Sequence, residues 1–103
     1  MFMTIISDCR DSNAFGRQKT RIGALFGSSI SAITTIGVSN ELEAAGNLVD
    51  VLDAAGGAGG IVLVNVAPRD SDTETSGWLN GTPFGYFFVR ETMVISTIGE
   101  MTL

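Results

Sequence analysis

Histidine is absent from this chain of 103 residues, and cysteine occurs once, at Cys9. Without histidine, the chain cannot form a Ser-His or Cys-His catalytic pair or a histidine metal site. A single cysteine excludes an internal disulfide and a zinc site built from several thiolates of one chain. Any acid–base chemistry must therefore use carboxylates, lysine, tyrosine or water.

Long apolar runs and excess positive charge are also missing. The run from Ile61 to Val64 is typical of the apolar stretches here, and a membrane span needs about 20 residues. The apolar start of the chain meets Asp8 at once and lacks the basic region of a secretory signal, so we expect a cytoplasmic protein without a membrane partner. Eleven acidic residues oppose six basic ones, for a net charge of -5, so nucleic acid is not an expected partner either.

Hydrophobic residues make up 45% of the chain and charged residues 17%, a composition typical of a folded protein. The length fits one domain, which we place over residues 1–103.

Local patterns predict alternating strands and helices. Apolar, β-branched runs predict strands over residues 3–7, 30–36 and 61–66, and helical spacing predicts helices over 13–26 and 41–53. Short connections between them imply right-handed crossovers, and so a three-stranded parallel core whose third strand is the most buried and has two parallel neighbours. Two later runs, 84–89 and 92–98, predict a C-terminal β-hairpin after a polar loop over 69–77. The predicted class is α/β.

The two helices are predicted to bury specific faces. Phe15, Gln18, Ile22, Leu25 and Phe26 share one face of the first helix; Leu42, Ala45, Val49 and Leu52 share one face of the second. Asp11 or Ser12 can cap the first helix and Ser39 or Asn40 the second, while Gly27 suits the end of the first. The glycine-rich run 56–60 precedes a strand instead of opening a helix, which favours a helix stop over a phosphate loop.

Ligands of parallel α/β sheets bind outside the carboxyl ends of the strands. The polar residues predicted there, together with one aromatic from the following loop, are the candidate binding residues: Asp8, Arg10, Asp11, Asn13, Ser39, Asn40, Asn65, Pro68, Arg69 and Trp78.

Asp8 is the strongest of these candidates, because a carboxylate accepts two hydrogen bonds at once and suits the vicinal diol of a ribose. The alternative is an ordinary capping or turn aspartate. Arg10 and Arg69 can equally form surface ion pairs with nearby acids. Trp78 can cover a ligand or a neighbouring subunit, or anchor the hairpin from inside.

One combination of segments resembles a known family. The string Ile5-Ile6-Ser7-Asp8, a helix, a β-rich segment ending near Gly37, a second helix, and the run from Gly59 to Pro68 together resemble the start of the S-adenosylmethionine hydroxide adenosyltransferase and halogenase (fluorinase and chlorinase) family. The resemblance covers about the first 70 residues. It implies that Asp8 holds the ribose of S-adenosylmethionine, that the Ala67-Pro68 turn flanks the sulfonium, and that the chain forms a trimer.

This sequence departs from that family's pattern in ways that concern catalysis. The hydroxide-transferring members carry an Asp before the proline and a later His, whereas this chain has Ala67 and no histidine. Halogenases add aromatic residues and a C-terminal β-barrel domain, so the chain is either a fragment or a minimal version of a two-domain protein, or an unrelated α/β domain.

Two functions follow as hypotheses. The first is a domain that binds S-adenosylmethionine or another adenosine-type nucleoside as substrate or ligand, without a resident cofactor or metal, with attack at the 5′ carbon as the implied reaction. The second is a non-catalytic structural or interaction domain that self-assembles into a homo-oligomer through its hairpin, which carries apolar residues on both faces.

Overall fold

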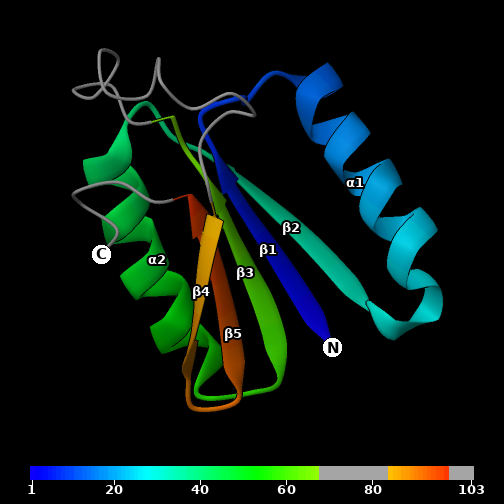
Figure 1. Cartoon of the computed structure of the whole chain (residues 1–103), viewed down its shortest axis with the longest axis vertical. Coiled ribbons are helices and arrows are strands. Elements are labelled where there is room, and N and C mark those ends of the chain that lie inside the picture. The colour runs from blue at the N-terminus through cyan, green and yellow to red at the C-terminus, as the bar shows by residue number, and fades with distance from the viewer. Residues whose placement is uncertain (68–83, 98–103) are drawn as a thin grey trace.

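The computed structural model describes residues 1–67 and 84–97, which form a mixed β-sheet with two α-helices (Figure 1). The predicted α/β class is confirmed. In chain order the elements are β1 (Phe2–Ser7), α1 (Ser12–Phe26), the short 3-10 helix η1 (Gly27–Ser29), β2 (Ala32–Gly37), α2 (Glu41–Ala55), β3 (Gly60–Asn65), β4 (Phe84–Val89) and β5 (Thr92–Thr97).

The sheet has five strands in the order β2-β1-β3-β5-β4. β1 pairs in parallel with both β2 and β3, and β3 also pairs in parallel with β5. β3 therefore has two parallel neighbours, as predicted. The predicted three-stranded core is only part of this sheet, because β5 fills the open side of β3 and brings the antiparallel edge strand β4 with it.

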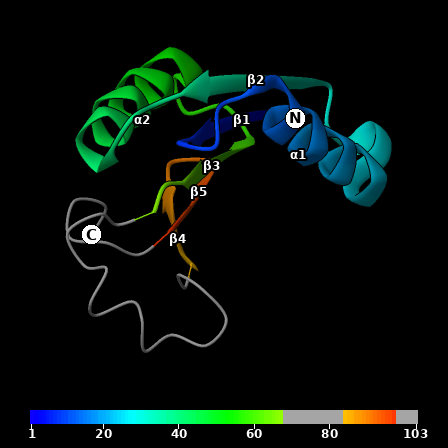
Figure 2. The ribbon, with the colours of Figure 1, turned by 90° about the horizontal axis from the view of Figure 1, so that it is seen from above.

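The helices lie on opposite faces of the sheet (Figure 2). On the α2 face, Val62, Val64 and Val94 pack with Ala44 of the helix. On the α1 face, Ile5 and Ile61 pack with Ile22. Each face has its own apolar core because the side chains of a strand alternate between the two sides of a sheet.

β1 is more completely buried than β3, contrary to the prediction. Five of the six β1 residues are buried, whereas Leu63 and Asn65 of β3 stay partly accessible on the α1 face. The continuous apolar run of β3 was a correct indication of a strand between two layers, but it carried no information on how far α1 reaches across that face.

The predicted face of α2 was wrong in part. Leu42 and Val49 are 68% and 66% exposed, and the helix instead packs through Ala44, Leu48, Val51 and Leu52. The small Ala44 side chain allows the helix backbone to lie close to the sheet. The residues that follow Ala44 at helical spacing are therefore the ones that pack against the sheet. On α1, Leu25 is 74% exposed, while Ile22 is buried as expected.

Glycines end both helices. Gly27 has φ 56° at the end of α1, and Gly56 takes the left-handed conformation at the end of α2. Side chains other than glycine rarely adopt such angles, so the run 56–60 acts as the predicted helix stop. It leads into the amino end of β3, away from the edge where parallel strands place ligands.

Candidate functional site

Asp8 lies where β1 leaves the sheet, beside the end of β3. Its backbone N–H donates to the carbonyl oxygen of Asn65 at 3.4 Å, and its side-chain Oδ2 accepts a hydrogen bond from the N–H of Ala67 at 3.0 Å. Asp8 is half-buried. A hydrogen bond across 59 residues of sequence thus joins the exits of the two adjacent strands through this carboxylate.

Asp8 does not cap α1. Asp11 does, because its Oδ1 accepts a hydrogen bond from the N–H of Ala14 at 2.8 Å. Asp11 therefore has the capping role that was the alternative for Asp8, and the Asp8 carboxylate faces the exit of β3 instead.

The strand order gives the exits of β1 and β3 a special position in the sheet. β1 is followed by α1 on one face of the sheet, and α2, which lies on the other face, precedes β3 (Figures 1 and 2). From β1 the chain continues to β2 on one side, and from β3 it continues to β4 and β5 on the other side. The exits of these two adjacent strands therefore lead in opposite directions, which defines the topological switch point where open α/β sheets bind ligands.

Thr97 fixes the exit of β3. Its buried hydroxyl donates to the carbonyl oxygen of Val66 at 2.8 Å and lies 3.2 Å from the N–H of Val66, from which it accepts. These contacts extend the link between β3 and β5 one residue beyond the strands. Val66 is held in place, and with it the N–H of Ala67 that Asp8 binds.

Arg10 connects the exits of β1 and β2. Its Nη1 donates to the Ser39 hydroxyl at 2.6 Å, and its stem lies over Gly37, where an added Cβ would come within 2.8 Å of the Arg10 Cβ. Gly37 provides the space for this arginine. Arg10 and Ser39 therefore form a pair at the predicted edge, with a hydroxyl as the partner of the guanidinium.

The other candidates have different roles. The side chain of Asn40 caps α2 by accepting from the N–H of Glu43 at 2.9 Å, and Glu43 accepts from the N–H of Ser39 at 2.9 Å. Asn13 is exposed on the first turn of α1. Pro68, Arg69 and Trp78 lie outside the described residues. The edge therefore brings together Asp8, Arg10, Ser39 and Asn65.

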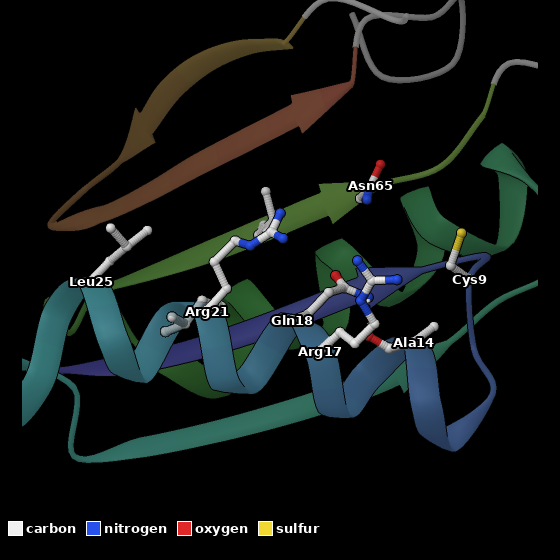
Figure 3. Close-up of a pocket in the computed structure, with 9 residues that line it drawn as sticks. Cys9, Ala14, Arg17, Gln18, Arg21, Leu25 and Asn65 are labelled. Atoms are coloured by element: carbon white, nitrogen blue, oxygen red, sulfur yellow. Dashed lines mark hydrogen bonds between the residues drawn. The ribbon is translucent and has the colours of Figure 1, made fainter.

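A groove of about 460 Å³ lies between α1 and β3, and its lining includes Cys9, the residue that follows Asp8 (Figure 3). Cys9 and Asn65 lie at its end near the strand exits. Leu63 and Ile22 supply apolar walls, and Leu25 lies toward the far end. The full lining is Cys9, Ala14, Arg17, Gln18, Arg21, Ile22, Leu25, Leu63 and Asn65.

Polar groups of α1 also line this groove. Arg17 and Arg21, one helical turn apart, extend from α1 toward β3 (Figure 3). Gln18 lies between them, and its Oε1 is buried without a hydrogen-bond partner in the described part of the chain. Buried polar oxygens are nearly always hydrogen-bonded, so this one requires an explanation.

Sequence reasoning missed Arg17, Gln18, Arg21 and Thr97 as site residues. It placed Gln18 on the face of the helix that was predicted to be buried, and the arginines were not among the residues of that face. The available signal was charge: α1 contains three basic residues and no acidic one, in a chain with net charge -5. Thr97 gave no signal, because its contact depends on β5 pairing with β3.

Other kinds of site are not found in the described residues. Residues 1–67 and 84–97 contain no group of three or more His, Cys, Asp or Glu side chains placed to hold a metal ion. Within the same ranges, no helix has the length and apolar character to cross a membrane. Comparisons with protein-family models, with curated proteins and with solved structures found no match.

Proposed function

We propose that this chain binds an adenosine-type nucleoside, with S-adenosylmethionine as the favoured ligand, at the exits of β1 and β3 and along the groove between α1 and β3. The observation that carries the proposal is the position of Asp8: a half-buried carboxylate at the topological switch point, without a capping role and directly before Cys9, which lines a groove. Pockets of a few hundred Å³ with apolar walls and few polar groups are typical of small-molecule sites.

Each group has a defined role in this proposal. The Asp8 carboxylate accepts hydrogen bonds from the ribose diol, and its contact with the Ala67 N–H orients it for that purpose. The apolar walls formed by Leu63 and Ile22 receive the base or the thioether part of the ligand. The resemblance of the first 70 residues to the S-adenosylmethionine hydroxide adenosyltransferase and halogenase family supports the same assignment.

The same resemblance implies a reaction at the 5′ carbon. A nucleophile forms a bond to that carbon while the bond to sulfur breaks, and the electron pair leaves with methionine. Positioning and desolvation supply most of the rate in such a displacement. Ala67 replaces the family's aspartate before Pro68, so the hydrolytic members' side-chain arrangement is not part of this proposal.

Substitution of Asp8 tests the site. Asp8→Asn preserves size and the contact with Ala67 but removes the charge, so nucleoside affinity is expected to fall by about 1.5–3 kcal/mol. The free energy of unfolding is expected to change much less. Calorimetric titration with S-adenosylmethionine and adenosine measures the affinity.

Asp11→Asn is the matched control, because it removes the same charge three residues away and asparagine caps a helix about as well as aspartate. The control is expected to bind like the wild type. Equal affinities of the wild type and Asp8→Asn, or no binding by the wild type, would refute the nucleoside assignment.

A second candidate function is self-assembly, favoured by the surface of β4. Phe84, Tyr86 and Phe88 lie on one face of this edge strand and are largely exposed, with Tyr86 72% accessible. Three aromatic side chains on an uncharged edge strand are typical of an interaction surface. The homo-oligomer is a trimer if the family resemblance holds.

Light scattering at micromolar concentration tests this second function. The wild type is expected to show the mass of an oligomer, and Tyr86→Lys is expected to shift it toward the monomer because a charge would be placed in the contact. Arg90→Gln, at the turn beyond the strand, changes charge without reaching the aromatic face and is the control. A monomer mass for the wild type would exclude self-assembly at that concentration.

A further inference from the structure

Charge is strongly segregated in this protein. The three basic residues of α1 face no acidic residue within the helix, which leaves three basic against eleven acidic residues in the rest of the chain. Two of the three, Arg17 and Arg21, line the groove; Lys19 is exposed and does not. The groove is therefore a locally positive site on an acidic protein, which favours a negatively charged ligand.

The guanidinium groups of Arg17 and Arg21 have no competing partner among the residues that the structure describes. Neither Arg17 nor Arg21 forms a hydrogen bond or ion pair with another residue in the ranges 1–67 and 84–97. Arginines one turn apart lie on the same side of a helix and can bind one anionic group together. Between them, Gln18 has a buried Oε1 without a hydrogen-bond partner in the described part of the chain, and this oxygen can accept from a ligand in the groove if the side chain turns toward it.

We infer that this groove binds the anionic group of the ligand, with Arg17 and Arg21 holding a phosphate or a carboxylate attached to the 5′ side of the nucleoside. The inference rests on the proposed nucleoside function and extends it to a preference for charged ligands. The α1 side of the groove runs from Ala14 to Leu25, about 16 Å along the helix axis, so it has room for a group beyond the ribose.

Four compounds separate the two sources of the anion. Adenosine and adenosine monophosphate differ by a phosphate; 5′-methylthioadenosine and S-adenosylhomocysteine differ by an amino-acid group that contains the carboxylate. Calorimetric titration of the wild type is expected to show at least tenfold tighter binding of the charged member of one pair or of both. The pair that shows the gain identifies the anion.

The variant Arg17→Gln/Arg21→Gln is expected to lose that gain while binding adenosine as the wild type does. Lys19→Gln is the matched control, since it removes a positive charge from the same helix outside the groove, and it is expected to keep the gain. Both arginines are exposed, so folding is expected to be unaffected, and circular dichroism checks this.

The outcomes distinguish the two proposals. If adenosine binds and neither charged member of the pairs binds more tightly, the inference is overturned and the nucleoside function stands. A gain that survives in the double arginine variant, or that Lys19→Gln removes equally, also overturns the inference. If none of the four compounds binds, both proposals fail.

Discussion

Gly60 and Phe2 offer a sharp test of how tightly the sheet is packed. The two residues are register partners on β3 and β1, and a Cβ added at Gly60 would lie 2.2 Å from the ring of Phe2. The ring thus occupies the space that a side chain at position 60 would need. Gly60→Ala forces the Phe2 ring to move, because nonbonded carbon atoms do not approach each other so closely.

The expected size of this effect follows from two opposing contributions. Overpacking of a core lowers the free energy of unfolding by about 1–3 kcal/mol. Replacing glycine by alanine at a relaxed position raises it by about 0.4–1 kcal/mol, because the unfolded chain loses conformational entropy. Phe2 is only partly buried and can shift, so we expect Gly60→Ala to lower the free energy of unfolding by about 1 kcal/mol in total. Urea unfolding followed by circular dichroism measures this change.

Gly59→Ala and Phe2→Val complete the test. Gly59 has nothing within 4 Å of an added Cβ, so its substitution is expected to leave stability unchanged or raise it slightly. In a Phe2→Val background, Gly60→Ala is expected to lose its penalty, giving a coupling free energy of about 1 kcal/mol or more in a double-mutant cycle. Additive effects of the two substitutions, or equal stabilities of Gly59→Ala and Gly60→Ala, would refute the packing argument.

Two further predictions concern α1. Asp11→Ala removes the cap on the N–H of Ala14 and is expected to lower the free energy of unfolding by about 1 kcal/mol, measured by urea unfolding, with no change in nucleoside affinity; an unchanged stability would refute the capping role. Gln18→Met replaces the orphan oxygen by an apolar group of similar size and is expected to raise stability by about 1 kcal/mol while weakening ligand binding. Thermal unfolding and calorimetry check the pair of effects, and a less stable Gln18→Met variant would contradict the assignment of Oε1 as unsatisfied.

The elements of the fold follow well from local sequence. The β-branched run Ile61 to Val64 and the glycine at position 56 predict a strand and a helix end by short-range rules, and the structure has both. For each helix cap, the sequence left two neighbouring candidates, because any polar residue just before a helix can accept hydrogen bonds from its free N–H groups. Structure selects Asp11 and Asn40.

Long-range pairing could not be predicted in the same way. Nothing in the residues of β5 specifies a parallel partner, and a two-stranded hairpin satisfies the local pattern equally well. The choice depends on β3, whose second edge would otherwise leave backbone groups unpaired next to a buried core. The buried face of α2 also depends on long-range packing. Faces that contain Leu42 or Ala44 both fit a helical period, and the close approach of the helix to the sheet selects the one with Ala44.

The candidate site could likewise be predicted only in part. Asp8, Arg10, Ser39 and Asn65 were predictable, because any parallel sheet places its strand exits at one edge. The groove was not predictable, because it depends on where α1 lies across the sheet. This helix buries only Ile22 fully, with Phe15 and Gln18 partly covered, and it leaves the side of Leu63 accessible.

The packing of α1 therefore has a consequence for function. A helix with a wider apolar face would close over β3, and Gln18 would be buried with no space beside it for a ligand. The observed helix instead holds polar and charged groups beside apolar ones, and within residues 1–67 and 84–97 the Gln18 oxygen and two arginines of the groove have no partner. A ligand that binds here would complete the contacts between α1 and β3. Because such a ligand binds the folded chain and not the unfolded one, it should raise the stability of the whole domain. If the ligand donates a hydrogen bond to Gln18, the cost of leaving this residue unsatisfied in the free protein is recovered on binding, which is why stability and affinity are expected to change in opposite directions at this residue.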